Sequence, residues 1–258
     1  MIKPLIIPPQ CNLSVAWTMA FLELMKPGQE ISHPAIVTIQ GFDITGEIEN
    51  TKIRNRLNLE LKKHKKNSCE TVAGTIFPSS MWNPILPDNA EVLYKRYEHA
   101  WPGIKMCQAN RKGVYFRRLT SYQSKNEGNN PVNQLQFVID TYKEGNHRKS
   151  AMQAAIFDPS RDHSNARQLG FPCLQQVTFT PIGDDQLSVT GFYAKQLHFE
   201  KAYGNYLGLY ELGRFMAKQL GLKLTQVICI ASCLERSELN KGDLKILAND
   251  LQSILNDS

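Results

Sequence analysis

The sequence predicts a single α+β domain in which strands are segregated from long helices. Its 258 residues are 42% hydrophobic, which is enough to bury one large core. Towards the carboxyl end, the residue pattern predicts a hairpin, followed by a long apolar helix and a further strand. Because no internal repeat or low-complexity linker divides the chain, we expect residues 1–258 to form one domain.

The amino-terminal third contains a strand pattern among helical patterns. Apolar side chains recur at helical spacing up to Pro27-Gly28, which stops the first helix, and a later helix stops before Pro78. The predicted elements are helices over residues 14–25, 57–66 and 69–76 and a β-branched strand over residues 35–44. From Pro78 to Pro102, prolines and scattered aromatic residues predict loop and short helices.

The carboxyl-terminal half alternates between the two periods. A turn centred on Gly183, Asp184 and Asp185 separates two β-rich segments and predicts a hairpin. The predicted helices are residues 133–142 and 203–220, and the predicted strands are residues 151–157, 175–180, 186–195 and 224–231. The helix over residues 203–220 is apolar on more than one side, so we expect it to be buried.

Composition excludes several classes of protein. The chain has no uncharged apolar run long enough for a membrane span, and its opening segment is too short and proline-broken for a secretory signal. We therefore expect a soluble, cytoplasmic protein with no membrane partner. The six cysteines are too sparse for a disulfide scaffold, so reduced thiols are expected. Cys229 and Cys233 lack a second ligand pair nearby, so no metal is predicted.

Positive charge is concentrated between Lys62 and Lys66, in a chain of net charge +6. Such a run attracts phosphate or nucleic acid, but it is more often the solvated carboxyl end of a helix, where cations are stabilised by the helix dipole. No zinc-finger, recognition-helix or aromatic-plus-basic pattern accompanies it. A nucleic-acid partner is therefore not expected.

Four strings occur in an order that resembles one enzyme family. GVYFRRLTSY contains Tyr115, KEGNHRKSA contains Arg148 and Lys149, RQLGFPCL contains Cys173, and YGNYLGLYELG contains Asn205. Together with the hairpin LSVTGFYAKQ, they resemble the thymidylate synthase family over roughly the last 140 residues. The resemblance implies a thymidylate synthase-like fold: a mixed β-sheet layered with long helices, with one sheet face forming a homodimer interface.

The resemblance also implies a role for each matching residue. Cys173 stands at the position of the nucleophile that attacks carbon 6 of a pyrimidine, and Tyr115 at that of the active-site tyrosine. Asn205 matches the asparagine that reads the pyrimidine edge. The other implied roles are a proton-transfer carboxylate for Glu70, phosphate contacts for Arg148 and Lys149 across the dimer and for Lys195 and Gln196 at the hairpin end, and a wall of the cofactor cavity for Trp82. The implied cofactor is 5,10-methylenetetrahydrofolate.

The chemistry explains why these residue types are needed. Carbon 5 of a pyrimidine is too inert to accept a one-carbon unit until a thiolate adds to carbon 6. Cations such as Arg148, Lys149 or Lys195 would have to lower the cysteine pKa from about 8.5. Plain alternatives remain: Cys173 as a buried structural cysteine, Glu70 as a helix-end carboxylate, Asn205 as a helix cap, Tyr115 as a core aromatic and Arg148 with Lys149 as turn charges.

Departures from the family pattern concern the phosphate and sugar contacts. Leu174 follows the cysteine where the family has histidine, and Ala194-Lys195 or Lys195-Gln196 replaces an arginine-serine pair. SCLERS, with Glu235 and Arg236, occupies the place of the residues that hold the sugar hydroxyl. Ordinary deoxyuridylate is therefore a doubtful substrate. Another pyrimidine nucleotide or nucleoside is expected, and the alternative is a catalytically silent nucleotide-binding or interaction protein.

Overall fold

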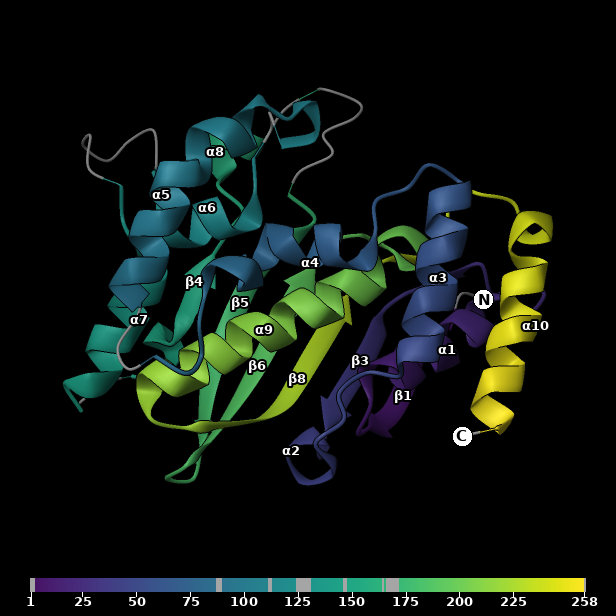
Figure 1. Ribbon diagram of the computed structural model, residues 1–258, viewed down its shortest axis with the longest axis horizontal. Coiled ribbons are helices and arrows are strands. Elements are labelled where there is room, and N and C mark those ends of the chain that lie inside the picture. Colours follow the sequence, from purple (N-terminus) through teal and green to yellow (C-terminus); the bar gives the residue numbers. More distant parts are fainter. Residues whose placement is uncertain are drawn as a thin grey trace.

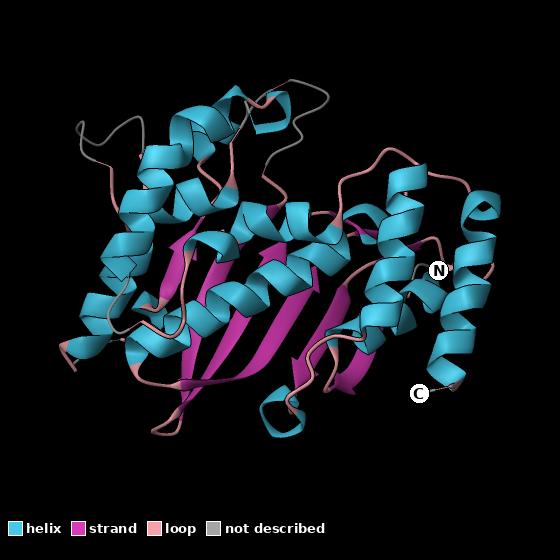
Figure 2. Ribbon diagram, viewed as in Figure 1, coloured by secondary structure: helices cyan, strands magenta, loops and turns pink. Residues whose placement is uncertain are grey.

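The computed structural model describes residues 3–86, 90–110, 113–123, 131–145, 148–163, 165 and 172–257. Within these residues, strands form a mixed six-stranded sheet with the order β1-β3-β8-β6-β5-β4. Their bounds are β1 Leu5–Gln10, β3 Ala35–Gln40, β4 Gln153–Ala155, β5 Leu174–Ile182, β6 Gln186–Tyr193 and β8 Lys223–Ala231. Helices are layered on this sheet (Figures 1 and 2), so the expected mixed sheet with long helices is confirmed at the level of fold class.

A second, smaller sheet lies where several chain segments meet. It joins β2 (Ile31–Ser32), β9 (Leu234–Glu235) and β7 (Gln196–Leu197), with β9 in the middle. β9 pairs in parallel with β7 and antiparallel with β2. Because β7 follows β6 and β9 follows β8, this sheet fixes the segments that leave the ends of two central strands.

The helices of the described residues vary widely in length. They are α1 Leu13–Leu24, α2 Phe42–Thr45, α3 Thr51–Lys63, α4 Cys69–Ile76, α5 Ala90–Met106, α6 Tyr115–Thr120, α7 Gln134–Lys143, α8 Pro159–Asp162, α9 Tyr203–Leu220 and α10 Lys241–Asn256. Short 3-10 turns are η1 Ser79–Met81, η2 Gln108–Asn110 and η3 Lys149–Ala151, and η4 His198–Ala202 is a π-helical turn. None of these helices is both long and apolar enough to cross a membrane.

Several predicted elements are confirmed by the structure. The helices α4 and α9 have the predicted bounds, and α7 begins after Asn133, whose side chain caps it by accepting a hydrogen bond from the Gln136 backbone. β5 and β6 form the predicted antiparallel hairpin, and the turn residue Gly183 has a positive φ of 58°. Lys62 and Lys63 lie in the last turn of α3, as expected for cations at a helix end.

Other boundaries were predicted wrongly. The strand predicted over residues 35–44 ends at Gln40, because Gly41 adopts a left-handed φ of 83° and starts α2. The stretch between Pro78 and Pro102, predicted as loop and short helices, contains the long helix α5, and Pro102 lies inside it. There the burial of Leu93 and Tyr97, one turn apart, outweighs the hydrogen bond that proline cannot make.

Helix α9 is the central buried helix of the domain and packs on both α4 and the sheet. A Cβ added to Gly204 would lie 2.5 Å from Val72 Cβ and 2.6 Å from the Cys69 carbonyl oxygen, so only glycine allows this approach to α4. On the sheet side, a Cβ on Gly191 would lie 2.6 Å from Leu209 Cδ1. These two close contacts fix the amino-terminal end of α9 against α4 and β6.

The face of the sheet opposite α9, which we call the uncovered face, carries no charged side chain in its central rows. Gly191 faces α9, so its strand neighbours Thr190 and Phe192 point to the other side. The register gives three cross-strand rows on that side: Ile36, Ile230, Phe192 and Gln176; Thr38, Ile228, Thr190 and Thr178; and Gln40, Gln226, Ser188 and Thr180. Phe192 is 40% exposed and Ile6, beside Ile36 on β1, is 64% exposed.

Candidate functional site

Cys173 and Tyr115 lie together at the start of β5. The backbone N–H of Cys173 donates a hydrogen bond to the Tyr115 hydroxyl at 3.3 Å. The Cys173 carbonyl accepts one from the Ala194 N–H at 3.0 Å, which ties the cysteine to the end of β6. Tyr115 begins α6, and the thiol of Cys173 is half-buried. The structure thus brings together two of the predicted catalytic residues, separated by 58 positions in the sequence.

Two lysines act electrostatically on the Cys173 thiol. Burial raises the pKa of Cys173 above its ordinary value, and the ammonium groups of Lys201 and Lys195 oppose that increase by stabilising the thiolate. The Lys201 side chain reaches solvent, yet enough protein surrounds it that desolvation lowers its pKa. Burial, followed by the proximity of Cys173, also raises the pKa of Tyr115.

Replacing Lys201 with methionine is expected to slow alkylation of Cys173 by iodoacetamide near neutral pH by about 3- to 10-fold, the effect of roughly half to one pKa unit. Removing the cation raises the thiol pKa, so less thiolate is present and the rate profile moves to higher pH. Mass spectrometry of the peptide that contains Cys173 measures the rate. Lys223→Met, at the far end of β8, is the control. Equal alkylation rates in wild type and Lys201→Met would show that Lys201 does not stabilise the Cys173 thiolate.

Asn205 lies at the same end of the sheet as Cys173. Leu209 packs against Gly191, and a Cβ on Gly213 would lie 3.1 Å from Val189, so α9 runs antiparallel to β6. Four residues of helix and two of strand each advance about 6–7 Å. One turn before Leu209, Asn205 is therefore level with Tyr193, the partner of Leu174 in the sheet. Asn205 is 4% exposed, and in the described residues its side chain makes no hydrogen bond.

Lys195 and Gln196, predicted as phosphate contacts, are already engaged. Lys195 Nζ lies 2.8 Å from Glu235 Oε1 in an ion pair, and its side chain is 53% exposed. Gln196 is buried, and its side-chain amide approaches Cys229 Sγ at 3.6 Å. Gln196 therefore serves the packing between the two sheets, whereas Lys195 remains at the surface beside the candidate nucleophile.

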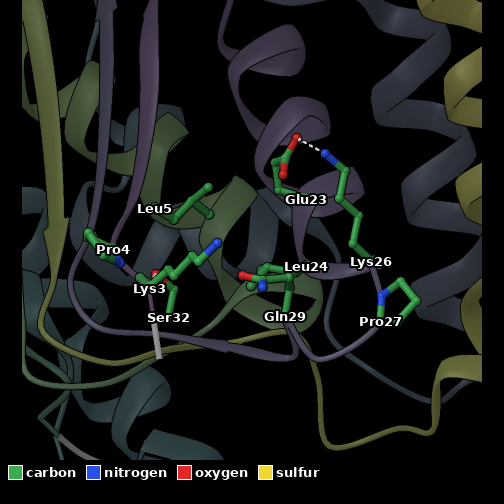
Figure 3. A pocket seen from close by; sticks show the side chains of 9 residues that line it. All are labelled: Lys3, Pro4, Leu5, Glu23, Leu24, Lys26, Pro27, Gln29 and Ser32. Carbon is green, nitrogen blue, oxygen red and sulfur yellow. Dashed lines mark hydrogen bonds and ion pairs between the residues drawn. The ribbon is translucent and has the colours of Figure 1, made fainter. Parts of the chain in front are cut away.

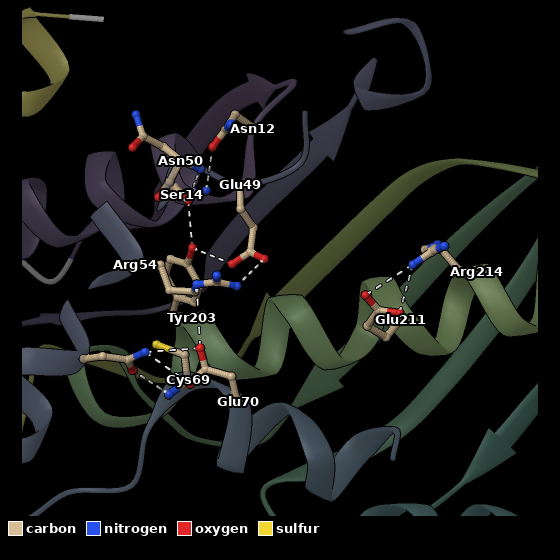
Figure 4. A network of polar contacts seen from close by, with 11 residues as sticks. Asn12, Ser14, Glu49, Asn50, Arg54, Cys69, Glu70, Tyr203, Glu211 and Arg214 are labelled. Atoms are coloured by element: carbon tan, nitrogen blue, oxygen red, sulfur yellow. Dashed lines mark hydrogen bonds and ion pairs between the residues drawn. The ribbon is translucent and has the colours of Figure 1, made fainter. Parts of the chain in front are cut away.

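Glu70 is held in a different network, on the α3 side of α9 (Figure 4). Asn58 Nδ2 donates to both carboxylate oxygens of Glu70 at 3.1 and 3.2 Å, and Arg54 Nε lies 3.6 Å from Oε1. Arg54 also binds Glu49, which accepts a hydrogen bond from the Tyr203 hydroxyl at 2.8 Å. No contact joins Glu70 to Cys173 among the described residues, and its catalytic role stays a prediction.

The remaining predicted residues lie apart from the cysteine. Trp82 is 7% exposed and packs edge-on against Phe77 and Phe215 in the core, with the Arg214 guanidinium 5.8 Å above its ring. Arg148 and Lys149 are exposed at the start of η3. The RQLGF portion of the string that leads to Cys173 lies outside the described residues.

Neither the cavity beside β1 nor any group of metal-ligating side chains in the described residues lies at Cys173. A cavity of about 380 Å³ is lined by Lys3, Pro4, Leu5, Glu23, Leu24, Lys26, Pro27, Gln29 and Ser32 (Figure 3). It lies beside β1, and three strands separate β1 from β5, so it does not reach the cysteine. In the part of the chain that the structure describes, no group of three His, Cys, Asp or Glu side chains could hold a metal ion.

Sequence reasoning missed Lys201 and Tyr193. Lys201 lies in the π-helical turn before α9, where helical periodicity gives no reliable direction for a side chain. Tyr193 is fully buried and its hydroxyl has no hydrogen-bond partner in the described structure, although Tyr115 and Cys173 act electrostatically on it. The alternating pattern of β6 marks Tyr193 as inward-facing, but its proximity to the thiol depends on the strand register.

No protein-family model matches the chain, and no curated protein is significantly similar to it.

Proposed function

We propose that this protein is a thymidylate synthase-like enzyme that uses Cys173 to activate carbon 5 of a pyrimidine for transfer of a one-carbon unit, a methyl or hydroxymethyl group. The observation that carries the proposal is the grouping of Cys173, Tyr115, Lys195 and Lys201 at one end of the sheet. A thiol, a buried phenol and two cations from three separate segments act on one another there. The order of strings in the sequence and the mixed sheet support the same reading.

In the first step, Cys173 acts as the nucleophile. Its thiolate, formed as the proton passes to water, adds to carbon 6 of a uracil or cytosine ring, and the electron pair of the carbon 5–carbon 6 double bond moves onto the ring carbonyl. Carbon 5 then accepts a proton from water. Loss of the original carbon 5 proton and expulsion of the thiolate restore the ring, so hydrogen at carbon 5 exchanges with solvent. Lys201 and Lys195 favour the thiolate that begins this sequence.

Asn205, Tyr115 and Glu70 have different roles in these steps. The Asn205 amide has both a donor and an acceptor, which matches the edge of a uracil ring. The Tyr115 hydroxyl accepts the Cys173 N–H and so helps to orient the segment that carries the thiol. Proton transfer by Glu70 is part of the proposal only if its bonds to Asn58 and Arg54 rearrange when substrate binds.

Trp82 does not fit the role of a cofactor wall. Phe77, Phe215 and Arg214 cover its ring, which leaves too little free surface for a folate to stack on. The proposal retains 5,10-methylenetetrahydrofolate as the one-carbon donor because of the sequence resemblance. Folate dependence is therefore a separate outcome of the assay below.

A homodimer formed through the uncovered face of the sheet is part of the proposal. Three rows of isoleucine, phenylalanine, threonine, serine and glutamine cross four strands without one charged side chain. In a chain with 21% charged residues, such a face is better suited to another protein surface than to water. A symmetric pair through this face would also let the exposed Arg148 and Lys149 serve the partner's site.

Release of tritium from carbon 5 tests the catalytic proposal. The protein is incubated with 5-tritiated uracil and cytosine nucleosides and nucleotides, with and without methylenetetrahydrofolate, and tritium in water is counted. We expect release from at least one substrate and loss of release, by more than about 1,000-fold, in Cys173→Ala, because the covalent step has no other nucleophile. Cys229→Ala is the matched control, a buried cysteine two strands from Cys173. Absence of release from every substrate by folded protein would refute catalysis.

A catalytically silent nucleotide-binding protein is the second candidate. Two observations favour it: burial raises the pKa of Cys173, and Glu70 is bound to Asn58 and Arg54 rather than to the cysteine. Such a protein would bind a pyrimidine ligand with equal affinity in wild type and Cys173→Ala and would release no tritium from it.

A further inference from the structure

The segments around Cys173 place a second pair of functional groups near the thiol. β5 and β8 lie on either side of β6. The segment that follows β6 forms a backbone hydrogen bond with each neighbour: the Ala194 N–H donates to the Cys173 carbonyl at 3.0 Å, and the Gln196 N–H donates to the Cys233 carbonyl at 2.8 Å. Lys195 stands between these two bonds. The Cys173 and Cys233 backbones are therefore about two strand spacings, or about 10 Å, apart, which is the length scale of a nucleoside.

Glu235 is fixed next to Lys195 by the smaller sheet. It lies in β9, the middle strand, and pairs with Ile31 on one side and Leu197 on the other. Its side chain is 28% exposed, so the carboxylate is held by rigid backbone and still reached by solvent. Lys195 Nζ forms an ion pair with Glu235 Oε1 at 2.8 Å. In the described residues, no hydrogen bond involves the other carboxylate oxygen of Glu235, Oε2.

This pair suits a hydroxyl group better than a phosphate. An ammonium donates hydrogen bonds and a carboxylate accepts them, and a hydroxyl does both. A phosphate that approached Lys195 would meet the negative charge of Glu235 at the same place and be repelled. Carboxylates recognise ribose hydroxyls in dinucleotide-binding proteins by the same complementarity.

We propose that the Lys195–Glu235 pair binds the sugar hydroxyls of the substrate, so that the enzyme acts on a pyrimidine attached to ribose rather than to deoxyribose. This inference rests on the proposed function of Cys173. The free oxygen of Glu235 accepts from the 2′-hydroxyl, and Lys195 donates to the neighbouring 3′-hydroxyl. A deoxyribose leaves the carboxylate oxygen without its donor, which weakens binding.

The test compares uridine with 2′-deoxyuridine and cytidine with 2′-deoxycytidine. Binding is measured as protection of Cys173 from iodoacetamide, which needs no turnover, and tritium release is measured in parallel. For whichever base, uracil or cytosine, binds more tightly, we expect the ribonucleoside to protect wild-type Cys173 at a concentration about 10-fold lower than its 2′-deoxy form does. Glu235→Gln is expected to reduce this ratio of protecting concentrations to about 2-fold or less, mostly because the ribonucleoside binds more weakly. The alkylation rate of each ligand-free variant provides its own baseline.

Glu91→Gln is the matched control, because Glu91 also pairs with a lysine, at 2.6 Å from Lys95 Nζ, and lies on α5, away from the Lys195–Glu235 pair. It is expected to keep the wild-type ratio. Equal protection by ribose and deoxyribose forms in wild type, or an unchanged ratio in Glu235→Gln, would overturn the inference while leaving Cys173 catalysis intact. Lack of both protection and release with every nucleoside and nucleotide would overturn the proposed function as well. The wild-type comparison needs no variant, so misfolding of Glu235→Gln does not prevent a decision.

Discussion

Replacing Arg118 with methionine is expected to lower the free energy of unfolding by about 3–5 kcal/mol. The Arg118 guanidinium forms a two-point contact with Asp162, at 2.8 and 3.0 Å, and the side chains of both residues are less than 8% exposed. It also donates to the Ile156 carbonyl at 2.9 Å. Methionine fills similar space but leaves the Asp162 carboxylate buried without its cation.

The adjacent arginine provides the control. Arg117 also forms an ion pair, with Glu98, but these side chains are 25% and 52% exposed, so Arg117→Met should cost no more than about 1 kcal/mol. Urea unfolding followed by circular dichroism measures both variants. A loss below about 1 kcal/mol for Arg118→Met would show that the buried pair is not a major source of stability.

Arg118 also links stability to the candidate site. It lies in α6, one turn after Tyr115, and its backbone carbonyl accepts a hydrogen bond from Gln134 at 2.9 Å. The same Gln134 side chain bonds both backbone groups of Ala155 in β4. Loosening α6 would therefore move the Tyr115 hydroxyl away from the Cys173 N–H, and tritium release should fall in Arg118→Met even where the protein remains folded.

Elements with a strong local signal were predictable from sequence. Helix α4 begins directly after Ser68, which caps it, and ends before Pro78, and α9 ends at Leu220, directly before Gly221 with its left-handed φ of 70°. Both signals act within a few residues of the boundary. Strand β1, which contains Pro8 and Pro9, could not be predicted in this way, because it depends on pairing with β3 at the edge of the sheet, where proline is tolerated.

The residues of the candidate site differ in the same way: some have a local sequence signal, and others depend on tertiary packing. Cys173 and Tyr115 were predicted because each lies in a recognisable string, and a hydrogen bond between the Cys173 N–H and the Tyr115 hydroxyl joins them in the structure. The lysine that accompanies them, Lys201, carries no local signal. Its position depends on how α9 packs against α4 through Gly204, a contact between residues about 130 positions apart. Pairing of Glu235 with Lys195 likewise arises only when the ends of β6 and β8 meet.

A single charge placed in the centre of the uncovered sheet face is expected to abolish the proposed homodimer. Ile230 lies between Ile36 and Phe192 in the most apolar of the three rows. In Ile230→Glu, dimerisation would bury two symmetry-related carboxylates without partners, and we expect the dissociation constant to rise by at least about 100-fold, or about 3 kcal/mol. Sedimentation velocity over a range of concentrations measures the change.

The control for this substitution is Ile246→Glu, which places the same charge on α10 at a residue that is 63% exposed. It should leave the oligomeric state unchanged. Because Arg148 and Lys149 are proposed to act across the dimer, a folded monomeric Ile230→Glu should bind nucleosides but lose affinity for nucleotides, whose phosphate those cations would hold. A wild-type protein that stays monomeric at every concentration would remove the dimer from the proposal, and Arg148 and Lys149 would then have no role at a site they cannot reach.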